Sequence, residues 1–146
     1  MGTRVNKGDI YREIEGTFGS VPTFIRQMPD EALLGFWSLE RDFELAETRI
    51  PSKYKELIGL AVSGATRCRY CVLFHTEAAR LQGATDEEIA EASMLAGVTM
   101  MASTFLNAQG TDYELFRRET LDIVAYARNQ MASASKGATE PRASAH

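Results

Sequence analysis

The sequence is poor in cysteine, histidine and tryptophan: 146 residues include two cysteines, two histidines and one tryptophan. It also lacks a cluster of basic residues, because its 16 lysines and arginines are scattered among 20 acidic residues and the net charge is -4. A protein that binds duplex nucleic acid normally presents a basic face, so we expect no nucleic-acid partner. Hydrophobic residues make up 45% of the chain, enough for a core without a disulfide or metal staple.

Targeting and membrane signals are also missing. Residues 1–11 lack the apolar run of a secretory signal. The longest apolar-rich segment, residues 90–108, is interrupted by one Glu, two Ser, two Thr and one Asn, which is unfavourable for a membrane span. We therefore expect a cytoplasmic protein with no membrane partner. In that compartment, a C-x-x-C pair is more often redox-active or metal-binding than a permanent structural disulfide.

Strand-like alternation is absent, whereas helical periodicity recurs along the whole chain, which predicts an all-α fold. A compact bundle of about six to seven helices is expected. The pattern predicts helices near residues 10–18, 30–45, 51–64, 67–81, 85–107 and 112–128. Asp30 is a predicted N-cap, Gly83 a predicted helix end, and Thr85 with Glu88 a predicted capping box.

The predicted helices differ in their apolar faces. Residues 90–108 are apolar nearly all round, which is typical of a core helix or a subunit interface. Two other helices have one apolar face each, formed by Leu33, Leu34, Trp37, Leu39 and Phe43 in the first and by Tyr54, Leu57, Ile58 and Ala61 in the second.

Residues 132–146 consist largely of Ala, Ser, Gly and Lys and contain no large apolar residue. Such a segment buries too little surface to offset the entropy lost on ordering it. We expect a single helical domain over residues 1–131, followed by a flexible tail over residues 132–146.

The chemistry of the chain is concentrated in Cys68, Cys71 and His75, which share one face of a predicted helix. A thiolate is the reactive form of cysteine, and it is favoured both by a helix N-terminus and by a nearby imidazole. The second thiol could then resolve a sulfenic acid or a mixed disulfide. The helix dipole favours Cys68 as the more acidic thiol, whereas the i, i+4 spacing to His75 favours Cys71, so the residues alone leave the order open.

Three other interpretations of the C-x-x-C pair are possible. A structural disulfide would close a very short loop and would gain only about 2 kcal/mol. A structural zinc site needs about four ligands, of which Cys68, Cys71 and His75 supply three and Glu56 could supply the fourth. A c-type haem is excluded because Val72, and not a histidine, follows the second cysteine.

A longer pattern joins these residues to Glu56. Eleven residues separate Glu56 from Cys68, and three separate Cys71 from His75. With the runs ELIGLAVS at residues 56–63 and GATDEEI at residues 83–89, this pattern resembles the alkyl hydroperoxidase D-like, carboxymuconolactone decarboxylase superfamily. By position alone, Glu56 in a first helical turn would be a solvated residue that favours the dipole.

The resemblance implies an all-helical fold that assembles as a trimer or hexamer. It also implies a thiol-dependent hydroperoxide reductase in which Cys71 attacks the peroxide, Cys68 resolves, and Glu56 and His75 relay protons. The partners would be a hydroperoxide and an external dithiol or protein reductant. One departure concerns Tyr70, which stands where peroxidase members carry a second histidine.

Two other functions stay open at this point. The first is a lactone decarboxylase of the same superfamily, whose members do not depend on a C-x-x-C pair. The second is a non-catalytic, redox-sensing oligomer with a disulfide switch. No metal or organic cofactor is expected, and no glycine-rich phosphate loop follows a strand.

Overall fold

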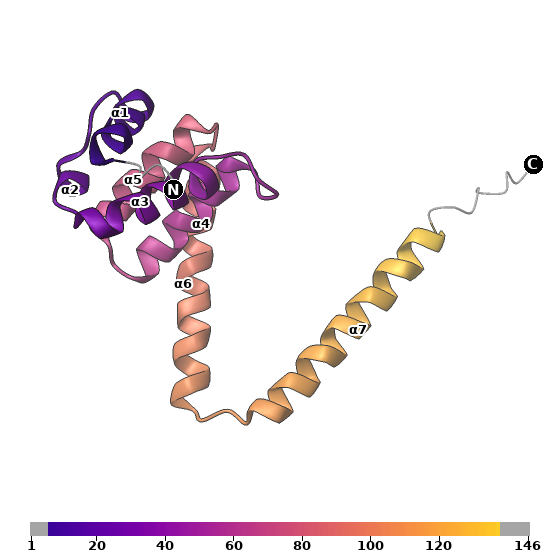
Figure 1. The fold of residues 1–146 in the computed structure, drawn as a ribbon. Helices are drawn as coiled ribbons and strands as arrows, with labels where there is room; N and C mark the ends of the chain where they lie inside the picture. The colour runs from indigo at the N-terminus through magenta and orange to yellow at the C-terminus, as the bar shows by residue number, and fades with distance from the viewer. Residues whose placement is uncertain (1–5, 138–146) are drawn as a thin grey trace, which may run out of the picture. The chain divides into compact units, whose positions relative to one another are not determined.

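The computed structural model describes residues 6–137 of the chain, with side chains as far as residue 134 (Figure 1). Over that range the chain is helical and contains no strand, so the all-α prediction is confirmed. The elements are α1 (Lys7–Phe18), α2 (Thr23–Arg26), α3 (Asp30–Leu39), the π-helical segment η1 (Glu40–Glu44), α4 (Ser52–Ala65), α5 (Arg69–Leu81), α6 (Asp86–Ala108) and α7 (Tyr113–Gly137).

The chain divides into two compact units, Met1–Thr99 and Met100–His146, and the boundary falls inside α6. The first unit contains α1 to α5 and the start of α6. The second contains the end of α6 and α7. Because α7 continues to Gly137, the first residues of the predicted tail are helical, and residues 138–146 lie outside the described part. The division into a domain of residues 1–131 and a tail stays a prediction.

The core of the first unit joins α1 to α3. Its buried apolar side chains are Ile10, Ile14, Val21, Ile25, Leu33 and Trp37. The Trp37 indole is buried, and its Nε1 donates a hydrogen bond to the Glu13 carboxylate at 2.9 Å. The same Glu13 oxygen accepts a hydrogen bond from Arg41 at 2.6 Å, so one carboxylate links α1 both to α3 and to η1. A buried indole N–H needs such a partner because an unpaired donor would cost free energy.

The third helix differs from its prediction at both ends. Pro29 occupies the N-cap position, so the predicted N-cap at Asp30 is wrong, and Asp30 is the first helical residue. At the other end the helix widens into η1, where the Leu45 N–H donates to the Glu40 carbonyl at 2.8 Å. A π-turn contains an extra residue and therefore rotates the helix face. As a result, Phe43 is 65% exposed, although it was expected on the apolar face.

Helices α4 and α5 pack against each other. The buried side of α4 is formed by Ser52, Glu56, Leu60 and Ser63, and not by the predicted apolar face: Tyr54 and Ile58 remain about half exposed.

The capping box at the start of α6 is confirmed. The Thr85 N–H donates to the Glu88 carboxylate at 2.9 Å, and the Glu88 N–H donates to the Thr85 hydroxyl at 3.2 Å. Glu88 also accepts a hydrogen bond from Lys53 at 2.7 Å, which joins α4 to the start of α6. These bonds to Lys53 and Thr85 hold the pKa of Glu88 below its ordinary value.

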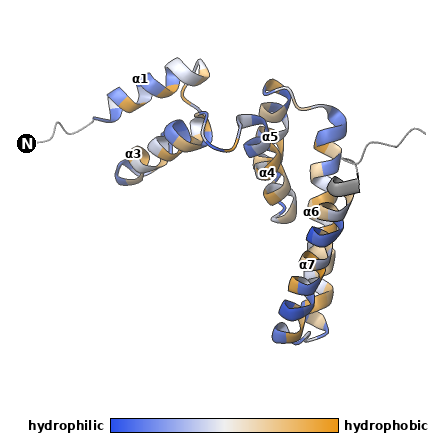
Figure 2. Ribbon diagram, turned by 90° about the vertical axis from the view of Figure 1, so that its right-hand side faces the viewer, coloured by the Kyte–Doolittle hydropathy of each residue, from blue (hydrophilic) through white to orange (hydrophobic). Residues whose placement is uncertain are grey.

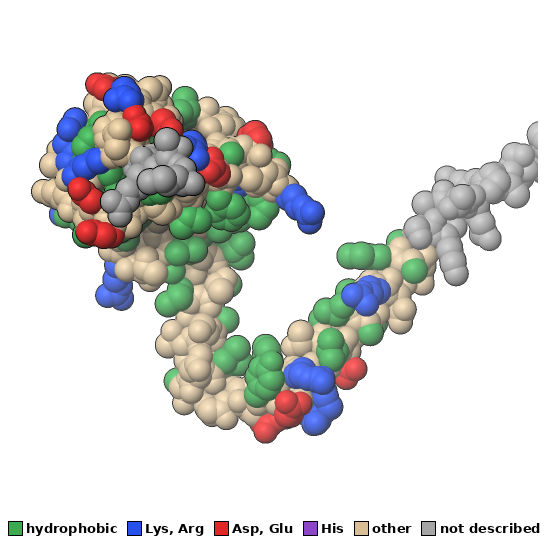
Figure 3. All heavy atoms as spheres, in the orientation of Figure 1, with side chains coloured by type: hydrophobic (Ala, Val, Ile, Leu, Met, Phe, Trp, Pro, Cys, Tyr) green, Lys and Arg blue, Asp and Glu red, His purple; other side chains and the backbone are tan. Residues whose placement is uncertain are grey.

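No residue of α6 is buried, so its interpretation as a core helix is not met in the described part of the chain. Large apolar side chains are exposed along both α6 and α7 (Figure 3). Hydrophobic residues alternate with hydrophilic ones along the ribbon of both helices (Figure 2). In length and composition α6 would suffice to cross a membrane, but core helices of globular proteins also meet this test, so the finding is weak evidence.

Leu33 and Leu34 provide a matched test of the core. Leu33 is fully buried, whereas the neighbouring Leu34 is 43% exposed. We expect Leu33→Ala to lower the free energy of unfolding by about 2–5 kcal/mol, since it removes buried contacts and leaves a cavity. Leu34→Ala should cost about 1 kcal/mol or less. Urea denaturation of both variants checks this, and equal losses would contradict the described packing.

Candidate functional site

The two cysteines lie where α4 turns into α5. Cys68 is the N-cap of α5, and its sulfur accepts a hydrogen bond from the Cys71 N–H at 3.3 Å. The helix therefore begins at Arg69, slightly later than predicted. Arg67, just before the cap, has a φ of 60°, the left-handed conformation that costs a non-glycine residue about 1–2 kcal/mol. This strained residue allows the abrupt turn that brings Cys68 to the start of the helix.

Cys68 and Cys71 are joined in a disulfide, with their Cα atoms 5.4 Å apart. Both residues are half-buried. The spacing and backbone conformation of the C-x-x-C segment thus place the two cysteines close enough to form an intramolecular disulfide. In this oxidised form neither sulfur is a thiolate, so the pair offers no ligand for the zinc site considered from the sequence.

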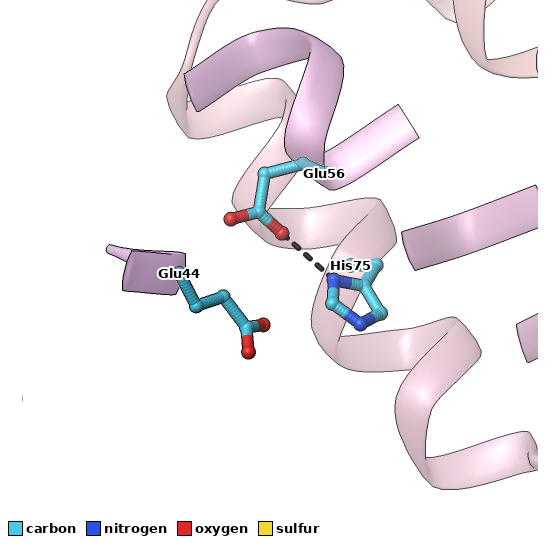
Figure 4. A group of neighbouring side chains, drawn as sticks. All are labelled: Glu44, Glu56 and His75. Atoms are coloured by element: carbon cyan, nitrogen blue, oxygen red, sulfur yellow. Dashed lines mark hydrogen bonds and ion pairs between the residues drawn. The ribbon is translucent and has the colours of Figure 1, made fainter. Parts of the chain in front are cut away.

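Glu56 and His75 form the second part of the site. The Glu56 carboxylate is 3% exposed and lies 2.8 Å from His75 Nδ1, whose side chain is 16% exposed (Figure 4). The interpretation of Glu56 as a solvated residue is therefore wrong. A carboxylate removed from water needs a hydrogen-bond partner, and the imidazole of α5 supplies it. A proton can pass between these two groups without either side chain moving.

Gly59 explains how the imidazole fits between α4 and α5. A Cβ atom at this position would lie 2.5–2.7 Å from three atoms of the His75 ring, closer than packing allows. The glycine thus leaves the space that the ring occupies. One turn further along, the Ser63 hydroxyl donates to the Gly59 carbonyl at 2.6 Å, so this buried polar group is also satisfied.

Two carboxylates from η1, Glu40 and Glu44, complete the polar part of the site. Glu40 is half-buried, and burial, followed by repulsion from and hydrogen bonding with Glu44, raises its pKa to about 7. This pKa includes a smaller lowering by His75 and a smaller raising by Glu56. The sequence analysis missed both residues. Their i, i+4 spacing was a signal, but regular helical periodicity placed Phe43 rather than Glu44 toward the protein interior.

The two cysteines, His75 and the two η1 carboxylates border one pocket of about 880 Å³, and Glu56 does not line it. Cys68, Cys71 and His75 lie on its α5 side, and Glu40 and Glu44 lie on its η1 side. The rest of the lining is mostly apolar and includes the aromatic rings of Phe18, Phe24, Phe36, Tyr70 and Phe74. The pocket can therefore admit an apolar molecule and place a polar atom of it beside the sulfurs.

Glu44, Glu56 and His75 could also contribute ligands to a cation, because one potential ligand atom from each lies within 4.8 Å of the others (Figure 4). Oxygen and imidazole ligands suit several divalent metals. The same atoms are equally suited to holding protons, since a carboxylate close to an imidazole is also a proton-transfer pair.

The match to a family model agrees with this geometry. Residues 32–108 match the carboxymuconolactone decarboxylase family, a range that includes both cysteines, His75, Glu56 and the two η1 carboxylates. The chain therefore belongs to the carboxymuconolactone decarboxylase family.

Solved structures and a curated relative extend the comparison. The crystal structure of an alkylhydroperoxidase AhpD core from Rhodospirillum rubrum is 28% identical with a TM-score of 0.66, over 75% of this chain and 84% of that one. A protein from Methanobacterium thermoautotrophicum is 31% identical with a TM-score of 0.53, over 60% and 96% of the chains.

An uncharacterised protein encoded in a cox locus of Paracoccus denitrificans is 33% identical over 63 residues, which is 43% of this chain. The match spans 57% of the length of that curated relative. The structural match to the alkylhydroperoxidase AhpD core confirms the AhpD-like fold that the sequence resemblance implied.

The structure brings the four predicted site residues into one region: the cysteines share a disulfide, and Glu56 and His75 share a hydrogen bond. Their catalytic roles stay predictions. Tyr70, which directly precedes the second cysteine, is 77% exposed and lines the same pocket.

Gly59 and Gly64 offer a matched test of the packing beneath the imidazole. Gly59→Ala places a methyl group on the His75 ring, so we expect it to lower the free energy of unfolding by about 1–3 kcal/mol. Gly64 lies in the same helix with nothing near its missing Cβ, so Gly64→Ala should be neutral or stabilise by up to about 1 kcal/mol. Thermal unfolding of the two variants measures the difference. A Gly59→Ala protein as stable as Gly64→Ala would contradict the close packing of His75.

Proposed function

We propose that the protein is a thiol-dependent hydroperoxide reductase. The observation that carries the proposal is the pairing of a C-x-x-C disulfide with a buried Glu56–His75 hydrogen bond at one mostly apolar pocket. In its reduced form the pair of thiols supplies two electrons to the peroxide and is oxidised to the disulfide. The carboxylate–imidazole pair supplies a base for one thiol, because a thiolate and not a thiol attacks peroxide oxygen.

The proposed cycle starts from the dithiol. The His75–Glu56 pair takes the Cys71 proton, and the thiolate attacks the outer oxygen of the hydroperoxide. The O–O bond breaks, Cys71 becomes a sulfenic acid, and the alkoxide takes up a proton to leave as an alcohol. Cys68 then attacks the Cys71 sulfur, which releases water and forms the disulfide. An external dithiol donates two electrons and two protons to restore both thiols.

The assignment of Cys71 as the attacking residue is supported by its place one turn before His75 on α5. Cys68, as N-cap, receives a backbone N–H and the positive end of the helix dipole. Both stabilise its thiolate, and this suits the second step, in which Cys68 must attack the sulfenic acid. The two positions thus fit different steps of one cycle.

The pocket supports an organic hydroperoxide as substrate, because apolar side chains, several of them aromatic, line most of it. The external reductant would be a small dithiol or a protein dithiol, in a reducing compartment such as the cytoplasm. The exposed apolar side chains of α6 and α7, among them Met94, Leu95, Phe105 and Ile123, support assembly into a homo-oligomer, as the family resemblance implies.

Stopped-flow oxidation of the reduced protein by an organic hydroperoxide tests the proton relay. We expect Glu56→Gln to slow thiol loss about 10²-fold at pH 7, because the amide cannot accept a proton. The exposed Glu87 supplies a control, and Glu87→Gln should oxidise at the wild-type rate. If Glu56→Gln kept wild-type kinetics, Glu56 would have no part in the mechanism.

Thiol counts separate the alternatives. Wild-type oxidation should consume both thiols in one intramolecular disulfide, faster than free cysteine, and Cys71→Ser should abolish it. A wild-type rate no greater than that of free cysteine would favour a redox-sensing disulfide switch. Turnover of a lactone by a protein with both cysteines replaced by serine would favour the decarboxylase function instead.

The oligomer proposal is tested by light scattering at micromolar concentration. We expect a mass several times the 16.2 kDa of one chain, since the apolar side chains of α6 would be covered in the assembly. Leu95→Glu, which places a charge on that surface, should shift the protein toward smaller species. A wild-type monomer under these conditions would contradict the assembly.

A further inference from the structure

Two cationic side chains, Arg41 and Lys55, form hydrogen bonds at the π-helical segment η1. Arg41, between the two carboxylates in sequence, is bonded to Glu13 and Asp42. At the end of the segment, the Lys55 ammonium donates to the backbone carbonyls of Phe43 and Ala46. These two cations are therefore engaged away from the cysteines.

Glu40 and Glu44, by contrast, line the pocket that holds Cys68 and Cys71. Among the described residues that line this pocket there is no lysine or arginine. His75 is the one lining residue that can become cationic, and it is already bonded to Glu56. No lysine or arginine among these lining residues can therefore stabilise a negative charge that develops in the pocket, whereas proton transfer to that charge would neutralise it.

Breaking the O–O bond of an alkyl hydroperoxide creates such a charge, because the departing alkoxide is a strong base. The Glu56–His75 pair has its own task in the proposed cycle, since it takes the proton from Cys71. A separate acid that borders the same pocket would allow both proton transfers to occur in one step.

We infer that Glu40 is a catalytic acid that protonates the departing alkoxide oxygen, an inference that rests on the proposed function. The thiolate sulfur forms a bond to the outer peroxide oxygen, and the O–O bond breaks. The Glu40 O–H bond breaks as the alkoxide oxygen takes the proton and leaves as an alcohol. Cys71 is oxidised to sulfenic acid, the peroxide is reduced, and the Glu40 carboxylate regains its proton from solvent.

Two observations support this role. Glu40 borders the pocket at the turn where α3 widens into a π-helix, a feature often found at functional sites. Its surroundings also keep the acid form populated at neutral pH: burial, Glu44 and Glu56 of α4 raise the pKa, His75 of α5 lowers it, and together they bring it to about 7.

The pH dependence follows from this pKa. The acid form of Glu40 is required, so its contribution is full well below pH 7, falls by about half near pH 7 and is lost as the pH rises further and the carboxyl ionises. Ionisation of the attacking thiol acts in the opposite direction. The wild-type rate should therefore pass through a maximum, and Glu40→Gln should lose the fall on the alkaline side.

Two oxidants with different leaving groups separate acid catalysis from a structural role. An alkyl hydroperoxide expels an alkoxide, whereas a peroxycarboxylic acid expels a weakly basic carboxylate that needs no proton. Stopped-flow oxidation of the reduced full chain would use tert-butyl hydroperoxide and peracetic acid. We expect Glu40→Gln to slow the first about 10²-fold and the second by no more than about threefold. Glu31→Gln, at an exposed position in the first turn of α3, should leave both rates unchanged.

The outcomes are distinct. A Glu40→Gln variant that slows equally with both oxidants, or not at all, contradicts the acid role, while a fast wild type still supports the proposed function. A wild type that reacts with tert-butyl hydroperoxide no faster than free cysteine contradicts the proposed function and the inference with it.

Discussion

The arrangement of the site depends on the burial of one carboxylate. Glu56 is nearly inaccessible to solvent, and the imidazole of His75, 2.8 Å away, is the partner that makes this burial tolerable. The hydrogen bond fixes how α4 and α5 approach each other, since Gly59 must leave room for the ring. Because His75 belongs to α5, this contact also positions the start of α5, with Cys68 and Cys71, relative to α4.

The π-turn at the end of α3 adds two further carboxylates to the pocket beside the α4–α5 pair. Glu40 and Glu44 of this segment line the same pocket as the two sulfurs, and Arg41 of the segment is bonded to Glu13 of α1. Because Glu13 also bonds Trp37, the hydrophobic core of α1 and α3 positions this wall of the pocket. The core and the site are thus connected through the polar contacts of Glu13 with Trp37 and Arg41.

Much of this could be predicted from the sequence. Helical periodicity located most of the helices, and the Thr85–Glu88 capping box formed as expected, because these features depend on local spacing. The grouping of the cysteines, His75 and Glu56 came from spacing and family resemblance, since no local rule shows that a glutamate in a first helical turn will be buried. Glu40 and Glu44 were missed for a different reason: a π-turn changes the helix register, and regular 3.6-residue periodicity cannot reveal it.

The central claim is that Cys71 attacks a hydroperoxide beside the Glu56–His75 pair. The most direct measurement is mass spectrometry of reduced Cys68→Ser protein treated with an organic hydroperoxide and dimedone, which traps sulfenic acid. Without Cys68 the intermediate cannot be resolved, so the account predicts one dimedone adduct on Cys71. A Cys71 thiol that remains unmodified, at a hydroperoxide concentration that oxidises both thiols of the wild type, would contradict the account.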